Sequence, residues 1–338
     1  MRKLIFATQK LDSRDPILAA TVQKVHALAA RVDELVVLCD SAEPGIAPAN
    51  VRVHEFGATT QLSRGARFAR ALAGELRPLP DAFLAHMIPL YVVIAAPLLR
   101  PLRVPIGLWY SHPKGHPLVR LAAAEATVVF SVDRSTFPLD SRKLVPIGHG
   151  IDVAEFSCRD EREPHEGLRA LVLGRYSPIK GLDTILRAAA LAAGAGVHVA
   201  LEAHGATGSQ SNDAHKAELE LLARSLGVDA VLGGAVPRSA IPALFARADL
   251  LINATHGASA DKVVYEAAAS CVPVLAASPA FGDLLPAELR FDFDRPDALA
   301  ERLVGLDPRR RPELREIVAA RHSVEHWADA VVATVGRR

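Results

Sequence analysis

Glu266, an acidic residue near the start of a predicted helix, is the position in this sequence that most clearly indicates chemistry. It follows an apolar strand and the small-residue loop 255–261, and a Pro-led strand comes after the helix. Backbone N–H groups and the helix dipole converge where such a loop enters a helix, so we expect an anion site there. A carboxylate repels phosphate but accepts hydrogen bonds, so its expected partner is a sugar diol beside the phosphate. Asp261 or Ser259 is expected to cap the helix, and Glu266 to lean back toward the ligand.

Two basic residues, Arg175 and Lys180, mark a second anion site. They lie five residues apart around a Pro turn, after an apolar run that ends in Gly174, and a helix opens directly after Gly181. Arginine presents a planar fork to phosphate oxygens, and lysine presents a mobile point charge. Two cations beside a helix N-terminus suit a diphosphate, including one that is leaving. A charged turn on the surface is the alternative explanation.

With two further motifs, these segments resemble the family-four glycosyltransferases, a large group of retaining enzymes of the GT-B fold that is also called glycosyl transferases group 1. Segment 145–156 resembles the family's interdomain Asn/Gly-Gly-Ile-Asp element, and segment 233–250 its strand, loop and helix before the glutamate motif. The likeness is strong over about residues 140–300 and looser in the N-terminal half. It implies that the chain uses nucleotide-sugar donors and retains the anomeric configuration.

The expected donor site combines the two anion motifs. We expect the diphosphate to be held by the two cations and by the helix start near Lys262, the ribose by Glu266, and the base by backbone around Val236 and the loop after Leu201. The donor-binding prediction comprises Gly174, Arg175, Lys180, His204, Val236, Asp261, Lys262, Val263 and Glu266. The residues expected to act in catalysis are His112, Arg175, Lys180 and Glu266.

The glutamate motif departs from the family pattern at its first position. The family sets two glutamates eight positions apart, and eight residues before Glu266 the sequence has Ala258. Because the first glutamate normally contacts the donor hexose, its absence puts sugar recognition and turnover in question. Lys262 is unusual at its place and could add a phosphate contact. Cys271 stands where the family prefers glycine, so the turn after the helix is expected to be built differently.

Acceptor binding is expected in the N-terminal half, at Lys10, His86 and His112. His112 lies in a loop after a strand, where related enzymes often carry an active-site histidine, and it could take a proton from an acceptor hydroxyl or bond to the donor sugar. A surface-loop histidine is the alternative. His86 follows another strand and His149 lies in the hinge element. Lys10 lies in the first loop, where a solvated loop explains it equally well.

The fold class is expected to be α/β, in the GT-B arrangement of two Rossmann-like, doubly wound parallel-sheet domains that face a central cleft. Strands and helices alternate along the chain, which predicts parallel sheets. The domains are expected at 1–157 for the acceptor and 168–312 for the nucleotide sugar, joined by a polar linker at 158–167. A helix in 313–338 is expected to cross back to the first domain. The early strands lack a dinucleotide fingerprint, which disfavours a nicotinamide enzyme.

Composition narrows the location and the partners. The net charge of +1 predicts no partner, and 5% aromatic residues disfavour nucleic-acid binding. The three cysteines are dispersed, which fits a reducing compartment and no zinc site. The N-terminus does not resemble a signal peptide, and no apolar run reaches the ~18 residues that span a bilayer. We therefore expect a cytoplasmic protein.

Two weaker patterns concern metals and membranes. Segment 292–294, Asp-Phe-Asp, imitates a metal motif of the other glycosyltransferase fold, but it precedes a helix start, so no metal is expected. Neither is a cofactor expected beyond the donor. Arg64, Arg67 and Arg70 share one face of a predicted helix. In lipid-modifying relatives such a helix contacts the inner face of the membrane, while a solvated face is the more common explanation.

The sequence thus predicts a retaining, metal-independent glycosyltransferase of polysaccharide biosynthesis. It would move a sugar from a UDP- or GDP-sugar to a hydroxyl of a glycan or a lipid-linked glycan. No carboxylate offers itself as a covalent nucleophile, which favours front-face attack with a phosphate oxygen taking the acceptor proton. A non-catalytic nucleotide-sugar-binding subunit or sensor is the alternative from another class, and a GT-B phosphorylase or epimerase is a second enzyme alternative.

Overall fold

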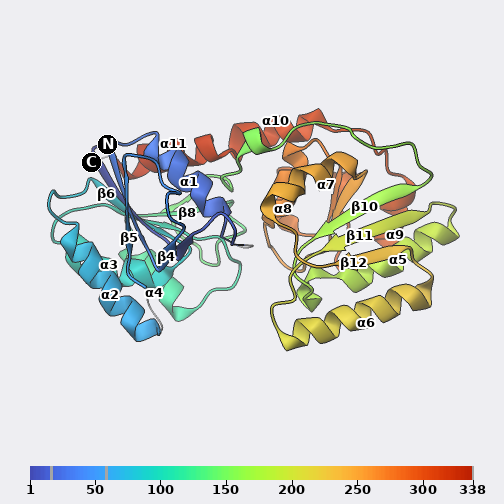
Figure 1. Ribbon diagram of the computed structural model, residues 1–338, viewed down its shortest axis with the longest axis horizontal. Helices are drawn as coiled ribbons and strands as arrows, with labels where there is room; N and C mark the ends of the chain where they lie inside the picture. The colour runs from blue at the N-terminus through green and yellow to red at the C-terminus, as the bar shows by residue number, and fades with distance from the viewer. Residues whose placement is uncertain (16–17, 58–59, 337–338) are drawn as a thin grey trace. The chain divides into compact units, whose positions relative to one another are not determined.

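The computed structural model describes residues 1–15, 18–57 and 60–336, and the chain divides into two compact α/β units. The first unit comprises Met1–Asp152 with Arg321–Arg338, and the second comprises Val153–Ala320. Each unit is built around its own parallel sheet (Figure 1). The expected fold class of two parallel-sheet α/β domains is confirmed.

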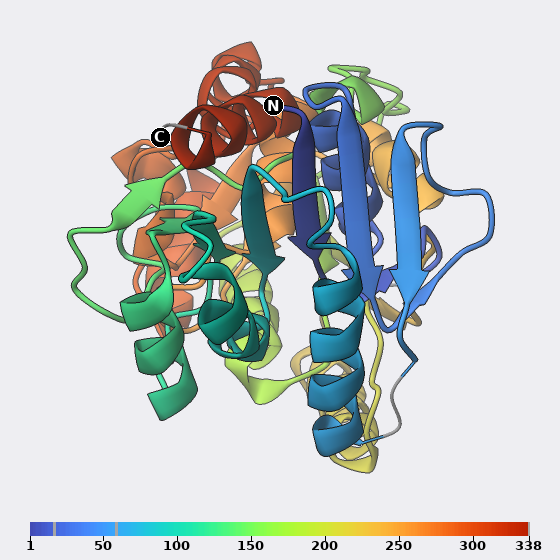
Figure 2. The same ribbon diagram turned by 90° about the vertical axis from the view of Figure 1, so that its left-hand side faces the viewer.

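The first unit contains a seven-stranded parallel sheet in the order β5-β3-β1-β6-β7-β8-β9. Apart from the edge strand β5, its strands are nearly continuous apolar runs, as expected for a sheet covered on both faces. Figures 1 and 2 show α2, α3 and α4 on one face and α1 and α11 on the other. The strands are β1 Lys3–Ala7, β3 Glu34–Cys39, β5 Val51–Glu55, β6 Ala82–His86, β7 Ile106–Trp109, β8 Val128–Ser131 and β9 Leu144–Pro146, with a small pair of β2 Lys10–Leu11 and β4 Ser41–Ala42. The helices are α1 Ala20–Ala29, α2 Gln61–Gly74, α3 Pro89–Leu99, α4 Pro117–Glu125 and α11 Val324–Val335.

The second unit contains a five-stranded parallel sheet in the order β12-β11-β10-β13-β14. Helices α5, α6 and α9 lie on one face, and α7 and α8 lie on the other (Figure 1). The strands are β10 Leu168–Leu173, β11 Val199–His204, β12 Ala230–Gly233, β13 Leu250–Asn253 and β14 Val274–Ala276. The helices are α5 Leu182–Gly194, α6 Gln210–Leu226, α7 Ile241–Arg247, α8 Lys262–Ala269, α9 Pro296–Val304 and α10 Pro312–Arg321.

The C-terminal region forms two helices rather than the single helix expected over residues 313–338. The break lies at His322 and Ser323, where the Ser323 hydroxyl accepts a hydrogen bond from the His326 N–H and caps α11. The carbonyl of His322 accepts hydrogen bonds from the N–H groups of Gly150 and Ile151. Helix α11 packs on α1, and α10 belongs to the second unit.

Segment 158–167, expected to be a linker, is part of the second unit. Arg162 forms an ion pair of 2.6 Å with Asp249, and His165 contacts the same carboxylate at 2.7 Å. Asp249 is 2% exposed and also accepts a hydrogen bond from the backbone N–H of Arg169, so it needs these partners. The polar composition of this segment predicted a solvated linker. In the structure, Arg162 and His165 instead compensate the buried carboxylate of Asp249 at the start of β13.

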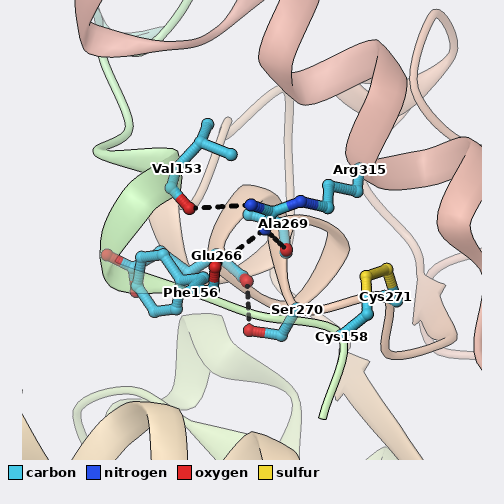
Figure 3. Close-up of a disulfide and its surroundings, with 8 residues drawn as sticks. All are labelled: Val153, Phe156, Cys158, Glu266, Ala269, Ser270, Cys271 and Arg315. Atoms are coloured by element: carbon cyan, nitrogen blue, oxygen red, sulfur yellow. Dashed lines mark hydrogen bonds between the residues drawn. A yellow bond between two sulfur atoms is a disulfide. The ribbon is translucent and has the colours of Figure 1, made fainter.

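Two of the three cysteines, Cys158 and Cys271, form a disulfide within the second unit (Figure 3). Their Cα atoms are 5.0 Å apart, and 113 residues separate them in the sequence. Disulfides persist in oxidising environments, so this pairing is at odds with the reducing compartment inferred from dispersed cysteines. Cys39 is free and buried. None of the helices in the described part of the chain is long and apolar enough to cross a membrane.

Removing the disulfide is expected to destabilise the second unit. A bond that closes a loop of 113 residues restricts the unfolded chain, and such bonds contribute about 2–4 kcal/mol. The double substitution Cys158→Ser and Cys271→Ser should lower the free energy of unfolding in urea by that amount. A reductant should lower the native protein to the same level and leave the double variant unchanged. Identical urea midpoints without reductant would contradict the pairing.

Stability is expected to fall as the pH decreases from 6.5 to 4, because of His322. Burial lowers the pKa of His322 to about 4, from an ordinary value of 6.5. Between these values the unfolded chain binds a proton and the folded chain does not, so acid favours unfolding. The loss at pH 4.5 relative to pH 7.5 should be roughly 2–3 kcal/mol from this group. Urea unfolding of His322→Phe at both pH values should show a correspondingly smaller loss, and an equal loss would refute the assignment.

Candidate functional site

The two sequence motifs lie together at the carboxyl ends of β10 and β13. These strands are neighbours in the sheet, and the chain leaves β10 toward β11 and returns through β12 to β13 on its other side. Ligands of open parallel sheets bind where the connections diverge in this way. A cavity of about 20 Å³ lies between the loops, lined by residues that include Gly174, Lys180, Asn253 and Thr255. It holds about one water-sized group, so a larger ligand has to lie over it.

The loop after β10 is held in place by close packing and by a buried tyrosine. Gly181 has a φ of +61°, and a Cβ atom there would lie 2.6 Å from the carbonyl oxygen of Ala254, so only glycine fits. Tyr176 is 3% exposed, and its hydroxyl donates hydrogen bonds to the carbonyls of Ala203 at 3.0 Å and Gly233 at 2.7 Å. Tyr176 thus ties this loop to the ends of β11 and β12, a role that the sequence analysis did not assign.

The two predicted phosphate-binding cations have different surroundings. The side chain of Arg175 is exposed, and its guanidinium makes no hydrogen bond or ion pair with any residue that the structure describes. The ammonium of Lys180, by contrast, lies 2.5 Å from the carboxylate of Asp261 and 3.4 Å from the hydroxyl of Thr255. Arg175 is therefore the cation that is open to a ligand, whereas Lys180 already has a counter-ion.

Asp261 occupies the N-cap position of α8, but its side chain makes no capping hydrogen bond. Its carboxylate accepts hydrogen bonds from the side chains of Lys180, Thr255, Asn253 and Ser259 instead. Burial raises the pKa of Asp261, but Lys180 and the hydrogen bonds from Asn253 and Thr255 outweigh it and hold the pKa below its ordinary value. The expected cap is wrong for Asp261, because a nearby ammonium competes better for a carboxylate than backbone N–H groups do.

Glu266 is buried at 1% exposure and is held by two cations. Its Oε1 atom lies 2.7 Å from the guanidinium of Arg238 and 3.2 Å from the ammonium of Lys262. Burial raises the pKa of Glu266, but Lys262 and Arg238 outweigh that effect and keep the carboxyl ionised. Lys262 is four residues before Glu266 on α8, so the side chain leans toward the helix start as expected. The phosphate contact considered for Lys262 competes with this ion pair.

Arg238 is a site residue that the sequence analysis missed. It lies in the loop after β12, and its guanidinium also contacts Glu155 at 2.6 Å. Its side chain is 15% exposed. The residue falls within segment 233–250, which the sequence analysis matched to the family, but nothing in that motif marks a basic residue as a partner of Glu266. Only the folding of β12 and α8 onto one unit brings them together.

The turn after α8 keeps the left-handed backbone that glycine would give. Cys271 has a φ of +59°, its N–H donates to the carbonyl of Ala268, and the N–H of Val272 donates to that of Ala267. These two bonds form a Schellman motif, so the expected difference in the turn is wrong. A cysteine in this conformation carries a steric cost that glycine would not.

The remaining donor-site predictions lie at the edges of this site. His204 ends β11, and its Nε2 and Nδ1 atoms contact Glu202 at 2.7 Å and the carbonyl of Gly234 at 3.3 Å. Val236 lies half-buried in the loop after β12, and Val263 is half-buried in the first turn of α8. The structure therefore places backbone of the β12 loop and His204 on one side of the β10 loop, and α8 on the other.

In the first unit, Lys10 lies in the short strand β2 that follows β1, His86 is the last residue of β6, and His112 follows β7; β1, β6 and β7 are neighbours in the sheet. Lys10 pairs with Asp15 at 3.3 Å. His86 is 5% exposed and stacks on the ring of Trp109 at 5.0 Å, and burial holds its pKa well below the ordinary value. His112 is exposed in the loop after β7 and accepts a hydrogen bond from the N–H of Lys114. Of the two histidines, only His112 is placed to meet a ligand from solvent.

The other patterns are accounted for by contacts within each unit. Arg64 pairs with Asp40 at 2.9 Å, and Arg67 donates to the carbonyl of Phe56, so two of the three arginines on α2 have local partners. Asp294 contacts His256 at 2.9 Å. Among the described residues no cluster of histidine, cysteine and acidic side chains could hold a metal ion.

Comparison with known proteins gives a family match for the second unit. Residues 167–307 match the family model described as Glycosyl transferases group 1. D-inositol 3-phosphate glycosyltransferase of Mycobacterium avium (strain 104) is 31% identical over 229 residues, which cover 61% of this chain and 47% of that protein. The chain thus spans about half the length of the curated relatives it matches.

Solved structures extend the likeness to both units. HepE of Anabaena, in complex with UDP and glucose, matches with a TM-score of 0.77 and 16% identity over 99% of both chains. Sucrose-phosphate synthase of Thermosynechococcus elongatus matches with a TM-score of 0.76 and 15% identity over 99% of this chain and 98% of that one. The second unit therefore carries a glycosyl transferases group 1 domain at residues 167–307, and the chain has the GT-B fold.

Proposed function

We propose that this protein is a glycosyltransferase that takes a sugar from a nucleotide-diphosphate sugar. One observation carries the proposal. The exposed cation Arg175 and the buried, ionised Glu266 both follow the carboxyl ends of strands at the switch point of one sheet. A cation such as Arg175 binds a diphosphate, and a carboxylate such as Glu266 accepts hydrogen bonds from a ribose diol. The family match at residues 167–307 and the binding of UDP and glucose by HepE support the same reading.

In this proposal the donor is a UDP- or GDP-sugar that lies across the carboxyl ends of β10 and β13. Arg175 contacts the diphosphate, and the start of α8 contributes positive potential, while Lys180 stays paired with Asp261. Glu266 accepts hydrogen bonds from the ribose, and backbone around Val236 contacts the base. Ala258 leaves the hexose without the family's usual glutamate contact.

We further propose retention of configuration without a metal ion. Negative charge grows on the leaving phosphate, and fixed cations stabilise that charge more than the ground state. Asp261 and Glu266 are both engaged by cations, which leaves neither as a covalent nucleophile. Front-face attack follows, in which a phosphate oxygen takes the proton of the acceptor hydroxyl. The donor is the only small molecule that the proposal requires.

The acceptor in this proposal is a hydroxyl of a glycan or a lipid-linked glycan, used in polysaccharide biosynthesis. His112, exposed in a strand-end loop of the first unit, is the residue that we assign to it. We place the reaction in the cytoplasm, at the inner face of the membrane when the acceptor carries a lipid. The disulfide of the second unit opposes a reducing location, and its reduction in cells is the direct check.

A non-catalytic nucleotide-sugar-binding subunit is the second candidate. Two observations favour it: Ala258 replaces the hexose-binding glutamate, and Asp261 already neutralises Lys180. Tight nucleotide binding without sugar transfer or donor hydrolysis would support this candidate, and either activity would remove it.

Arg175→Ala is expected to abolish donor binding. A cognate ligand at a hundredfold excess over its Kd stabilises a protein by about 2.7 kcal/mol, which thermal unfolding detects. A screen of UDP, GDP and their sugars should give such a shift with the native protein and none with Arg175→Ala. Arg187→Ala, which removes another exposed arginine of the same unit, is the matched control and should keep the full shift. An undiminished shift in Arg175→Ala would place the donor elsewhere.

The anomeric outcome tests the mechanism. With an α-linked donor that gives a thermal shift and a glycan acceptor, NMR of the product should show an α linkage. The rate should be unchanged by EDTA, because Arg175 and the start of α8 supply the positive charge. A β-linked product would overturn retention, and a rate that EDTA abolishes and a divalent cation restores would overturn metal independence.

A further inference from the structure

Arg238 bridges two carboxylates that come from different parts of the second unit. One terminal nitrogen of its guanidinium lies 2.7 Å from Oε1 of Glu266, and the other lies 2.6 Å from Oε2 of Glu155. The geometry uses the planar fork of arginine, since each arm has its own acceptor. Burial lowers the pKa of Arg238, but Glu266 and Glu155 outweigh it and raise the pKa above its ordinary value. The bridge is therefore fully charged.

Glu155 is a rigid anchor because the segment around it is attached to α8 and α10. Figure 3 shows Arg315 of α10 reaching the carbonyls of Val153 and Phe156 on one side and that of Ala269, at the end of α8, on the other. The disulfide from Cys158 to Cys271 fixes the same segment three residues further on. Segment 153–158 therefore cannot shift without breaking several contacts.

The bridge leaves one oxygen of Glu266 available. Both Arg238 and Lys262 contact Oε1, and no donor among the described residues contacts Oε2. A carboxylate held on one oxygen by two cations has a defined orientation, and its second oxygen can accept a hydrogen bond from a ligand. Without Arg238, Lys262 alone would hold the group, through a flexible side chain on the same helix.

We propose that Arg238, anchored by Glu155, is a positioning residue that directs Oε2 of Glu266 at the ribose hydroxyls of the donor. Arg238 does not touch the ribose itself. It determines how strongly the site prefers a nucleotide with a ribose diol over one without it. This inference rests on the proposed function, because it assumes that Glu266 meets a nucleotide ribose.

The test is the ratio of the dissociation constants for 2′,3′-dideoxy-UDP and UDP, measured by calorimetry on the full chain. If the thermal-shift screen identifies GDP instead, the ratio is measured with 2′,3′-dideoxy-GDP and GDP. The native protein should prefer the ribonucleotide by about tenfold or more, since hydrogen bonds to a charged group contribute of that order. Glu266→Gln and Arg238→Met should both bring the ratio close to one, through loss of affinity for the ribonucleotide alone. Arg238→Lys should retain part of the preference, because lysine reaches one carboxylate only.

Arg162→Met is the matched control. Arg162 also bridges two carboxylates, Asp160 and Asp249, with a similarly covered side chain, but it lies at the start of β13 instead of its end. The control should lose stability and keep the native ratio. If Arg238→Met does not fold, Arg238→Lys and Glu155→Gln carry the test, and both should lower the ratio.

The outcomes separate this inference from the function it rests on. A native protein that binds neither UDP nor GDP refutes the proposed function. A native protein that binds the nucleotide but ignores the ribose diol refutes the role of Glu266, and with it this inference, while the diphosphate site at Arg175 stands. A preference that Glu266→Gln abolishes and Arg238→Met leaves intact overturns the positioning role alone.

Discussion

The ligand-facing side of the second unit depends on one constraint, which is that the buried carboxylate of Glu266 must be compensated. At 1% exposure, an ionised carboxyl group costs several kcal/mol unless cations and hydrogen bonds compensate it. Lys262 compensates from the same helix and Arg238 from the loop after β12. The arrangement holds only if α8, that loop and segment 153–158 keep their positions. The Schellman turn after α8, the disulfide and the hydrogen bonds of Arg315 together hold these segments in place.

The charges at the ends of the strands divide into those that build the protein and those that are open to a ligand. Lys180 and Asp261 neutralise each other, as do Arg162 and Asp249 at the opposite edge of the same sheet. Arg175 remains exposed and is the cation on which the proposed donor binding depends. In the first unit, His86 is buried and neutral, and His112 is the exposed member of the pair. The proposed chemistry thus uses few of the polar residues gathered at these edges.

The disulfide and the charged segment 158–167 show how a connection becomes part of a domain. Polar composition normally indicates a solvated linker, because exposed charges need no partners. Here the side chains of Arg162 and His165 contact the buried carboxylate of Asp249. Cys158 is bonded to Cys271, which lies just after the end of α8. The segment therefore supports the same helix that carries Glu266.

The fold class could be predicted from the sequence, because strand and helix periodicity depends on neighbouring residues, and the resemblance of four short motifs pointed to the family whose model matches residues 167–307. The position of Arg175, Lys180 and Glu266 after the ends of strands could be predicted in the same way. The partners of these groups could not: Arg238 is 28 residues from Glu266, Asp261 is 81 residues from Lys180, and the bonded cysteines are 113 residues apart. Which charge is open and which is neutralised depends on contacts between distant segments. Only the tertiary structure decides those, since burial makes an unpaired charge too costly and selects its partner.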